Sequence, residues 1–348
     1  MVALTASRRS WRQPGAEFSQ HLAPILLSAC LSGMPVLSDV RGSREHTAAA
    51  VGAAEGAVLE RSPHIAPWPE ASAAALRDDG CILVRDTLSP PTVAALRAHC
   101  ESELADGLAK VASGAGAEHQ YFGTILARSD RHDLKLALSP VVSTALAEVL
   151  TSIAPLVRGA FLNHVEPTEC DTHEEPVLAE LGAIRSTQGA PRQPLHSDTR
   201  RADAPVLLTA FVALQDVEES MGPTTFLPGS HRDERAHAAL GHAGQKAEFL
   251  RSCPSRLGVM PAGACTLYDS RLLHAGGANS DTRGRWLFYA GFAPSRVVMR
   301  ELRGDQYEPL QRASHTLSQL ERGGNGNEGD IELEAVWAAL LRPRQNIF

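Results

Sequence analysis

The residues of this chain best suited to chemistry are two histidines, an aspartate and an arginine. His196 and Asp198 are separated by one residue, and His274 and Arg285 follow much later. Two imidazoles and one carboxylate are the ligand set of the facial triad, which holds non-haem iron and leaves coordination positions open. A guanidinium offers a fixed fork of donors that can bind a carboxylate through two hydrogen bonds. The set indicates an oxygenase that binds iron(II), dioxygen and a small dicarboxylate, 2-oxoglutarate.

The spacing of these residues fits one metal ion. Two residues apart on a strand, His196 and Asp198 would project from the same face. His274 follows an apolar strand predicted over 264–268, and a partner strand across a barrel would bring it opposite them. Two neutral imidazoles and one carboxylate neutralise one charge of iron(II). The remaining positions are then free for a bidentate co-substrate and dioxygen.

Two other histidine–acid pairs share the spacing, as expected by chance among 14 histidines. His173 and Glu175 lie in an acidic segment typical of a solvated loop. His231 and Asp233 follow a Pro-Gly-Ser turn and are predicted to begin a helix or loop. His196 alone is followed by a well-formed apolar strand and by a matching histidine and arginine. We therefore expect His196, and not its rivals, to be a ligand.

The clamp for the dicarboxylate has two candidates. Arg285 begins a predicted strand, and a position next to the strand that precedes His274 would point it inward. Arg283 stands two residues earlier. Because side chains alternate along a strand, both could face the same way. Without the triad, either arginine would be interpreted as a surface residue in a basic turn.

The rest of the chain predicts a mainly β protein with flanking helices. Proline residues 63, 67 and 69 mark the start of the folded body. Helices are predicted over 70–78, 89–108 (with Ser89 as cap) and 140–150, and strands over 81–85, 206–217, 224–227, 264–268 and 286–292. Short strands separated by Gly and Pro turns are typical of a sandwich or jelly roll.

Composition excludes several classes of protein. The net charge of −7 disfavours nucleic acid or an anionic membrane surface as a partner. The six cysteines form no Cys-X-X-Cys pair, which suits a reducing compartment. No apolar run reaches the roughly 18 residues of a membrane span. Residues 1–65 are either a flexible extension or a transit peptide, because arginines 8, 9 and 12 precede the first acidic residue. An intracellular protein, cytoplasmic or organellar, is expected.

Three segments carry a resemblance to a known family. They are Gln193-Pro194-Leu195-His196-Ser197-Asp198, then 222–231 (Gly-Pro-Thr-Thr-Phe-Leu-Pro-Gly-Ser-His), then His274-Ala275-Gly276-Gly277-Ala278-Asn279 with Arg285 beyond. In order and spacing they resemble the phytanoyl-CoA dioxygenase family. Its members are iron(II)- and 2-oxoglutarate-dependent oxygenases built on a double-stranded β-helix, a cupin-like jelly roll. The resemblance spans about residues 80–292.

The resemblance implies a role for each matching residue. His196, Asp198 and His274 match the iron ligands, and Arg285 matches the arginine that pairs with the far carboxylate of 2-oxoglutarate. Gln193 and Thr224 match positions that often donate hydrogen bonds to the co-substrate. Asn279 matches an asparagine that holds the loop after the second histidine.

The resemblance also implies the organisation of the chain and its reaction. Residues 66–310 would form the catalytic jelly roll, and 311–348 a tail with a short helix around 332–341. The protein would hydroxylate a small-molecule metabolite and release succinate and CO2. A coenzyme A thioester is not implied, because the segment before Gln193 is unlike that of the acyl-CoA-using members. The sequence does not indicate the oligomeric state.

Two other classes of function stay open at this stage. A cupin-like metalloenzyme would use zinc, nickel or manganese without 2-oxoglutarate, and would need the triad but not the arginine. A non-catalytic jelly-roll binding protein would need neither.

Overall fold

The computed structural model describes residues 65–162, 175–199, 207–240, 242–296, 298 and 315–323. The predictions for the N-terminal 64 residues, for His173 and for the helix at 332–341 lie outside these residues. The described part of the chain is built around two β-sheets.

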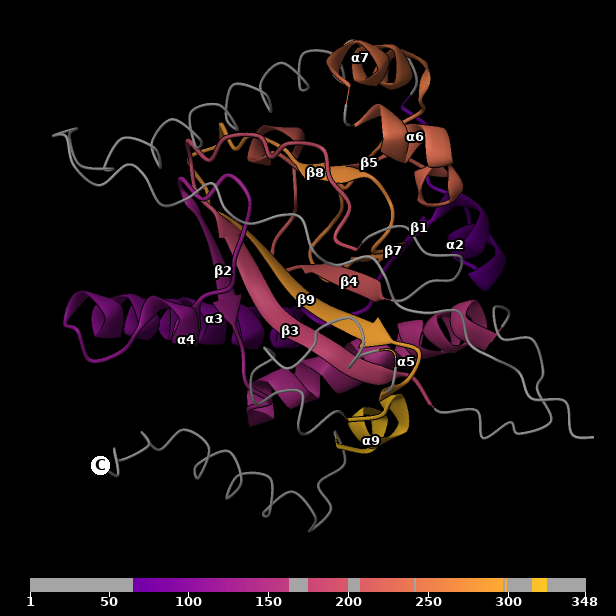
Figure 1. Ribbon diagram of the computed structural model, residues 1–348. Helices are drawn as coiled ribbons and strands as arrows, with labels where there is room; N and C mark the ends of the chain where they lie inside the picture. The colour runs from indigo at the N-terminus through magenta and orange to yellow at the C-terminus, as the bar shows by residue number, and fades with distance from the viewer. Residues whose placement is uncertain are drawn as a thin grey trace, which may run out of the picture. The chain divides into compact units, whose positions relative to one another are not determined.

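Every neighbouring pair of strands in these sheets is antiparallel. The larger sheet has the order β1 (Cys81–Val84), β7 (Cys265–Asp269), β4 (Leu208–Ala213), β9 (Arg285–Ala293), β3 (Val177–Ser186), β2 (Arg131–Lys135). The smaller sheet has the order β6 (Arg256–Leu257), β5 (Thr224–Phe226), β8 (His274–Gly276). Figure 1 shows the smaller sheet above one face of the larger one. The protein is a jelly roll with flanking helices, as the sequence predicted.

Both faces of the larger sheet are largely buried, because each face packs against other residues. On β9, Trp286 and Phe288 belong to a core cluster shared with the long helices, while Leu287 packs in a second cluster with Phe226 of the smaller sheet. Burial of both faces explains why every residue of β4 is buried and its sequence, Leu-Thr-Ala-Phe-Val-Ala, does not alternate between apolar and charged residues. The inner face, between the sheets, is where the site residues lie.

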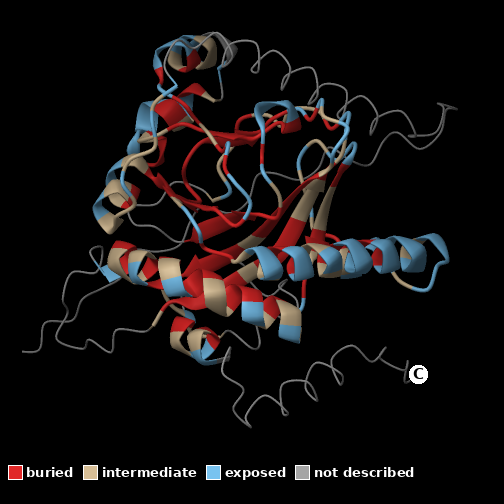
Figure 2. Cartoon of the chain, turned by 180° about the vertical axis from the view of Figure 1, so that it is seen from behind, coloured by how far each residue is buried: buried red, intermediate tan, exposed pale blue. Residues whose placement is uncertain are grey.

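The two long helices cover the outer face of the larger sheet. They are α3 (Pro90–Ala112) and α5 (Pro140–Leu162), and they pack against each other (Figure 1). Exposed residues lie along the outer side of α3 (Figure 2). Ser89 is the N-cap of α3 as predicted, with prolines in the first turn, although its side chain makes no capping hydrogen bond. The shorter helices are α2 (Ala73–Asp79), α4 (Glu118–Tyr121), α6 (Glu234–Ala239), α7 (Ala243–Ser252) and α9 (Leu317–Gly323).

Helix α5 continues well beyond the predicted end at residue 150 and passes through Pro155. Ile153, Val157 and Phe161 extend its buried face beyond the predicted end, and this packing compensates for the hydrogen bond that proline removes. By length and composition α5 is the one described helix that could cross a membrane, with a mean hydropathy of 1.6. Ten of its residues are buried in the core, which is the packing of a core helix.

Two regions that the sequence analysis left without elements are part of the sheet and core. Strands β2 and β3 form one edge of the larger sheet, and polar residues such as Glu180 and Arg185 within β3 obscure its apolar pattern. Helix α9 lies in the predicted tail, yet Leu317 is fully buried against α5. The backbone of His315 also accepts a hydrogen bond from Leu178. The packed core therefore includes residues 315–323, and the limits 66–310 stay a prediction.

We expect Leu317→Ala to destabilise the protein by about 2–4 kcal/mol, because it removes a fully buried side chain from the α5–α9 contact. Chemical denaturation measures this change. Leu108→Ala on α3 is the matched control, since that leucine is 40% exposed and its loss should change little. Equal effects for the two variants would contradict the packing of α9 described above.

Candidate active site

The backbones of His196 and His274 pair directly. The His196 amide donates to the His274 carbonyl at 3.0 Å, and the His274 amide donates back at 2.8 Å. His274, the first residue of β8, thus lies opposite His196 as predicted, but the predicted strand through His196 and Asp198 is wrong: His196 forms an isolated antiparallel bridge and Asp198 lies in a bend. The two imidazole centroids lie 4.5 Å apart as a result.

Asp198 completes the group from a bend just after this bridge, where its amide donates to the carbonyl of Ser270 at 2.8 Å. One carboxylate oxygen, Oδ1, lies 3.6 Å from Nε2 of His196 and 3.5 Å from Nε2 of His274. One ligand atom from each residue lies within 4.8 Å of the others. The structure thus brings together the three residues that the sequence singled out.

Both imidazoles are held with Nε2 towards Asp198. Nδ1 of His196 lies 2.9 Å from the Pro194 carbonyl, and Nδ1 of His274 lies 3.0 Å from the Leu272 carbonyl. A carbonyl only accepts, so the neutral ring carries its proton on Nδ1 and leaves the Nε2 lone pair free for a metal. Burial is the main cause that lowers the pKa of His196 to about 4, and the neighbouring His274 is the second cause. The donor set therefore fits a divalent metal ion.

A tyrosine that the sequence analysis did not select binds the third ligand. The Tyr268 hydroxyl donates to Oδ2 of Asp198 at 2.9 Å. The ring is buried and lies 5.0 Å from the His274 ring. Burial is the main cause that raises the pKa of this phenol well above its ordinary value, and the Asp198 charge is the second cause. The hydroxyl therefore keeps its proton.

Arg285 lies on the inner face of the larger sheet, and only 2% of its surface is exposed. Its guanidinium donates to the carbonyl of Gly222 and, at 3.4 Å, to the hydroxyl of Ser186. Nε has no hydrogen-bond partner in the described part of the chain. The inward orientation was predicted, but β9 lies between β4 and β3 and is not adjacent to β7, the strand that precedes His274.

A second buried arginine, Arg131, faces Arg285 across β3. Arg131 pairs with Ser186, and Ser186 pairs with Arg285, so the three form one row across three adjacent strands. Nε of Arg131 donates to the Ser186 hydroxyl at 3.1 Å, and its other donors bind the carbonyls of residues 127, 191 and 277. The sequence analysis missed Arg131. The strand that carries it, Arg-His-Asp-Leu-Lys, has one apolar residue and no alternating pattern, so β2 was not recognised.

The row of Arg131, Ser186 and Arg285 is suited to an anion. Burial lowers the pKa of Arg131 to about 10. Burial lowers the pKa of Arg285 to about 9, and the nearby positive charge of Arg131 is the second cause. Among the described residues no carboxylate pairs with either guanidinium. Because two buried like charges without a counter-ion are costly, a bound carboxylate would relieve them. Arg131 also donates to the Gly277 carbonyl at 3.2 Å, three residues beyond His274, which links this row to the segment that carries the second histidine.

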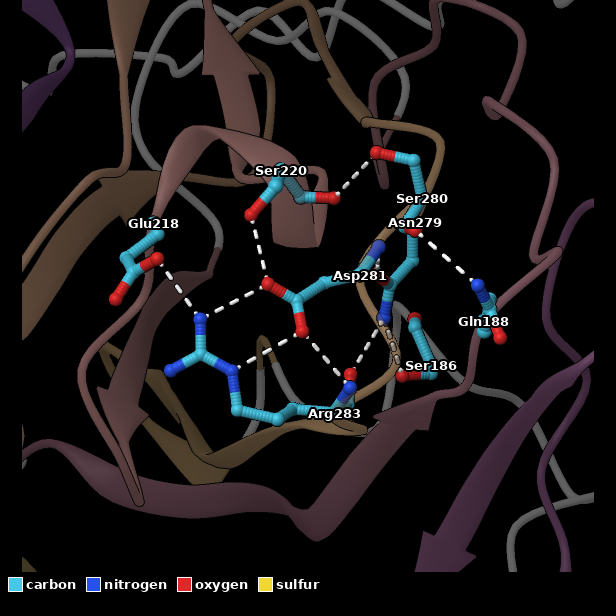
Figure 3. A network of polar contacts seen from close by, with 8 residues as sticks. All are labelled: Ser186, Gln188, Glu218, Ser220, Asn279, Ser280, Asp281 and Arg283. Atoms are coloured by element: carbon cyan, nitrogen blue, oxygen red, sulfur yellow. Dashed lines mark hydrogen bonds and ion pairs between the residues drawn. The ribbon is translucent and has the colours of Figure 1, made fainter.

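Arg283, the alternative clamp, lies in a different environment (Figure 3). Its side chain is 53% exposed, and Nη2 pairs with Asp281 at 2.9 Å and with Glu218 at 2.8 Å. Hydrogen bonds from Arg283 hold the pKa of Asp281 well below its usual range. Surface carboxylates already occupy this guanidinium, so the geometry favours Arg285 as the clamp.

The two further co-substrate residues implied by the resemblance lie on either side of β8. The Gln193 side chain accepts from the Gly276 amide at 2.9 Å and donates to the Leu126 carbonyl at 3.1 Å. Thr224 is buried on β5, directly opposite Gly276. Gln193 is thus engaged in protein contacts that hold β8, and binding of the co-substrate by either residue stays a prediction.

Asn279 holds the loop between His274 and Arg285, as predicted (Figure 3). Its side-chain amide donates to the Ser186 carbonyl at 2.9 Å, and its oxygen accepts from the Asp281 amide at 2.9 Å. The rival pair His231 and Asp233 begins a helix, as predicted. His231 lies in a 3-10 turn and its ring binds the Arg77 carbonyl, and Asp233 caps α6.

Comparison with known proteins agrees with this geometry. The family model for phytanoyl-CoA dioxygenase (PhyH) matches residues 76–286, more than half of the chain. The chain belongs to the phytanoyl-CoA dioxygenase family. It is therefore a dioxygenase that depends on iron(II) and 2-oxoglutarate.

Individual relatives are more distant. Dioxygenase FrzG of Cladobotryum sp is 28% identical over 247 residues, which cover 64% of this chain and 72% of that protein. Among solved structures, the epimerase SnoN from nogalamycin biosynthesis is 21% identical, with a TM-score of 0.47, covering 73% of this chain and 91% of SnoN. EctD from S. alaskensis is 19% identical, with a TM-score of 0.45, covering 67% of this chain and 81% of EctD.

We expect Asn279→Ala to destabilise the protein by about 1–3 kcal/mol, because it leaves the buried Ser186 carbonyl and the Asp281 amide without their partner. Chemical denaturation measures the loss. Gln188→Ala is the control, since its amide makes one exposed 3.4 Å contact in the same network (Figure 3). A cost for Gln188→Ala as large as that for Asn279→Ala would show that Asn279 does not hold the loop.

Proposed function

We propose that the protein hydroxylates a small-molecule metabolite at an iron(II) ion held by His196, Asp198 and His274. Arg285 binds the far carboxylate of 2-oxoglutarate, and Arg131 adds positive charge behind it. The observation that carries this proposal is the proximity of two sites. The ligand atoms of two histidines and one aspartate lie within 4.8 Å of one another. A buried guanidinium pair, which has no carboxylate partner among the described residues, is linked to the His274 segment through the hydrogen bond from Arg131 to the Gly277 carbonyl.

The overall reaction balances without any further reductant. 2-Oxoglutarate, dioxygen and the substrate give succinate, CO2 and the hydroxylated product, so one oxygen atom enters succinate and the other enters the product. Iron(II) bound to the triad would supply the redox chemistry that couples the two oxidations.

The residues of this chain have distinct tasks in that reaction. The carbonyls of Pro194 and Leu272 fix both imidazoles as neutral ligands. His196, Asp198 and His274 would hold the ion through three ligand atoms, which leaves coordination positions for the co-substrate and dioxygen. Arg285 orients 2-oxoglutarate by its far carboxylate, so its keto acid end reaches the metal.

The buried arginine row distinguishes this function from the two alternatives. A cupin-like metalloenzyme that does not use 2-oxoglutarate has no need for two buried guanidiniums beside its metal. A binding protein without catalysis has no need for imidazoles fixed as ligands. Family membership favours the oxygenase over both.

The first test is metal binding. We expect anaerobic titration with iron(II) to show one bound ion per chain, and His196→Ala and Asp198→Ala to lose it, because each removes one of three ligands. Subsequent addition of 2-oxoglutarate to the wild-type complex should give a weak visible charge-transfer band. His231→Ala is the control for loss of a buried histidine outside the triad. If Asp198→Ala retained wild-type affinity for iron(II), the assignment of the triad would be wrong.

The second test separates the two arginines. We expect Arg285→Met to weaken 2-oxoglutarate binding at least about 100-fold, since a buried charged hydrogen bond contributes roughly 3 kcal/mol or more. Arg283→Met should change it less than about threefold, because that side chain is an exposed ion-pair partner. The charge-transfer band, followed at increasing concentrations of 2-oxoglutarate, measures the affinity of each variant for the co-substrate. The reverse order of effects would move the clamp to Arg283.

A further inference from the structure

The two oxygens of the Asp198 carboxylate have different surroundings. Oδ1 faces the two imidazoles, at 3.6 Å and 3.5 Å from their Nε2 atoms. Oδ2 accepts a 2.9 Å hydrogen bond from the buried Tyr268 hydroxyl. The carboxylate therefore offers one oxygen to the metal position and has the other engaged by the protein.

Tyr268 is rigidly placed for this contact. It lies on β7, an interior strand of the larger sheet that pairs with the edge strand β1 on one side and with β4 on the other. Its ring packs against Phe211 at 5.2 Å, Phe226 at 5.3 Å and His274 at 5.0 Å. With 1% of its surface exposed, the ring has little room to rotate away from Asp198.

We infer that Tyr268 is a positioning residue that keeps Asp198 a one-oxygen ligand and thereby preserves a coordination position for the co-substrate. This inference rests on the proposed metal site. A carboxylate bound through both oxygens would occupy one more position on the ion, and that position would be lost to 2-oxoglutarate or dioxygen. The hydrogen bond to Oδ2 opposes such a rotation. Outer partners of this kind orient ligands and commonly affect metal affinity.

The test is Tyr268→Phe, which removes the hydroxyl and keeps the aromatic packing. We expect iron(II) affinity, measured by anaerobic titration, to fall about 10–100-fold. At saturating iron(II), the 2-oxoglutarate-dependent visible band should require a higher 2-oxoglutarate concentration, because the freed Oδ2 competes for the metal. A residue with only a structural role would move neither quantity in folded protein.

Tyr289→Phe is the matched control. Its hydroxyl also donates to a carboxylate, Oδ1 of Asp133, at 2.9 Å, on the same inner face of the sheet. The two variants lose the same chemical group and the same kind of hydrogen bond, so Tyr289→Phe should retain the iron(II) affinity of the wild type. Thermal unfolding of the metal-free variants checks that both are folded.

The outcomes separate the two proposals. If the wild type binds iron(II), Asp198→Ala does not, and Tyr268→Phe loses less than about threefold in affinity, the role of Tyr268 is overturned and the metal site stands. If Tyr289→Phe loses as much as Tyr268→Phe, the specific role of Tyr268 is also overturned. If the wild type binds no iron(II), both proposals fail.

A measurement on the wild type covers the case in which Tyr268→Phe does not fold. The chain has four tyrosines. Labelling them with 13C at Cζ, and assigning Tyr268 by Phe variants of the other three, gives one resonance that reports this hydroxyl. Addition of Zn(II) to the metal-free protein should shift the Tyr268 resonance, because its acceptor then shares charge with the metal. An unchanged resonance at saturating Zn(II) would overturn the inference.

Discussion

The active-site geometry depends on one pair of backbone hydrogen bonds, between His196 and His274. This pair joins residues that are far apart in the sequence and sets their imidazoles side by side. A shift of one residue in the pairing would turn a side chain to the opposite face and dismantle the ligand set. Strand β8 is short, but its pairing with β5 and the Gln193 contact to Gly276 hold this register. The chemistry therefore requires that the smaller sheet be correctly aligned.

The larger sheet contributes charge. Its strands β2, β3 and β9 place Arg131, Ser186 and Arg285 directly opposite one another on the inner face. The serine hydroxyl lies between two guanidiniums that would otherwise repel each other in a buried setting. The Gly277 carbonyl, three residues beyond His274, accepts from Arg131 and joins this row to the metal ligands. Both halves of the site are thus fixed to the same short segment of chain, which limits their relative movement.

The fold was predictable where a strand is apolar or a helix has a clear start. The strands around 208–213, 265–269 and 285–293 and the helices beginning at 90 and 140 follow from their patterns. Strands β2 and β3 do not, because their inner-face positions carry charged residues or glycine, such as Arg131, Glu180 and Gly182, in place of apolar ones. One of these residues, Arg131, is part of the candidate site. Helix α9 was missed because a seven-residue helix has too few apolar positions to show a period.

The sequence by itself determined the candidate ligands His196, Asp198 and His274 and an arginine soon after them, because a metal site and a carboxylate clamp require side chains of those types. Tertiary structure decided the rest. Alternation along a strand could not separate Arg283 from Arg285, and only the folded chain pairs Arg283 with surface carboxylates. Arg131 and Tyr268 are likewise visible only after strand pairing, since hydrogen bonds across a sheet depend on a register that local sequence does not encode.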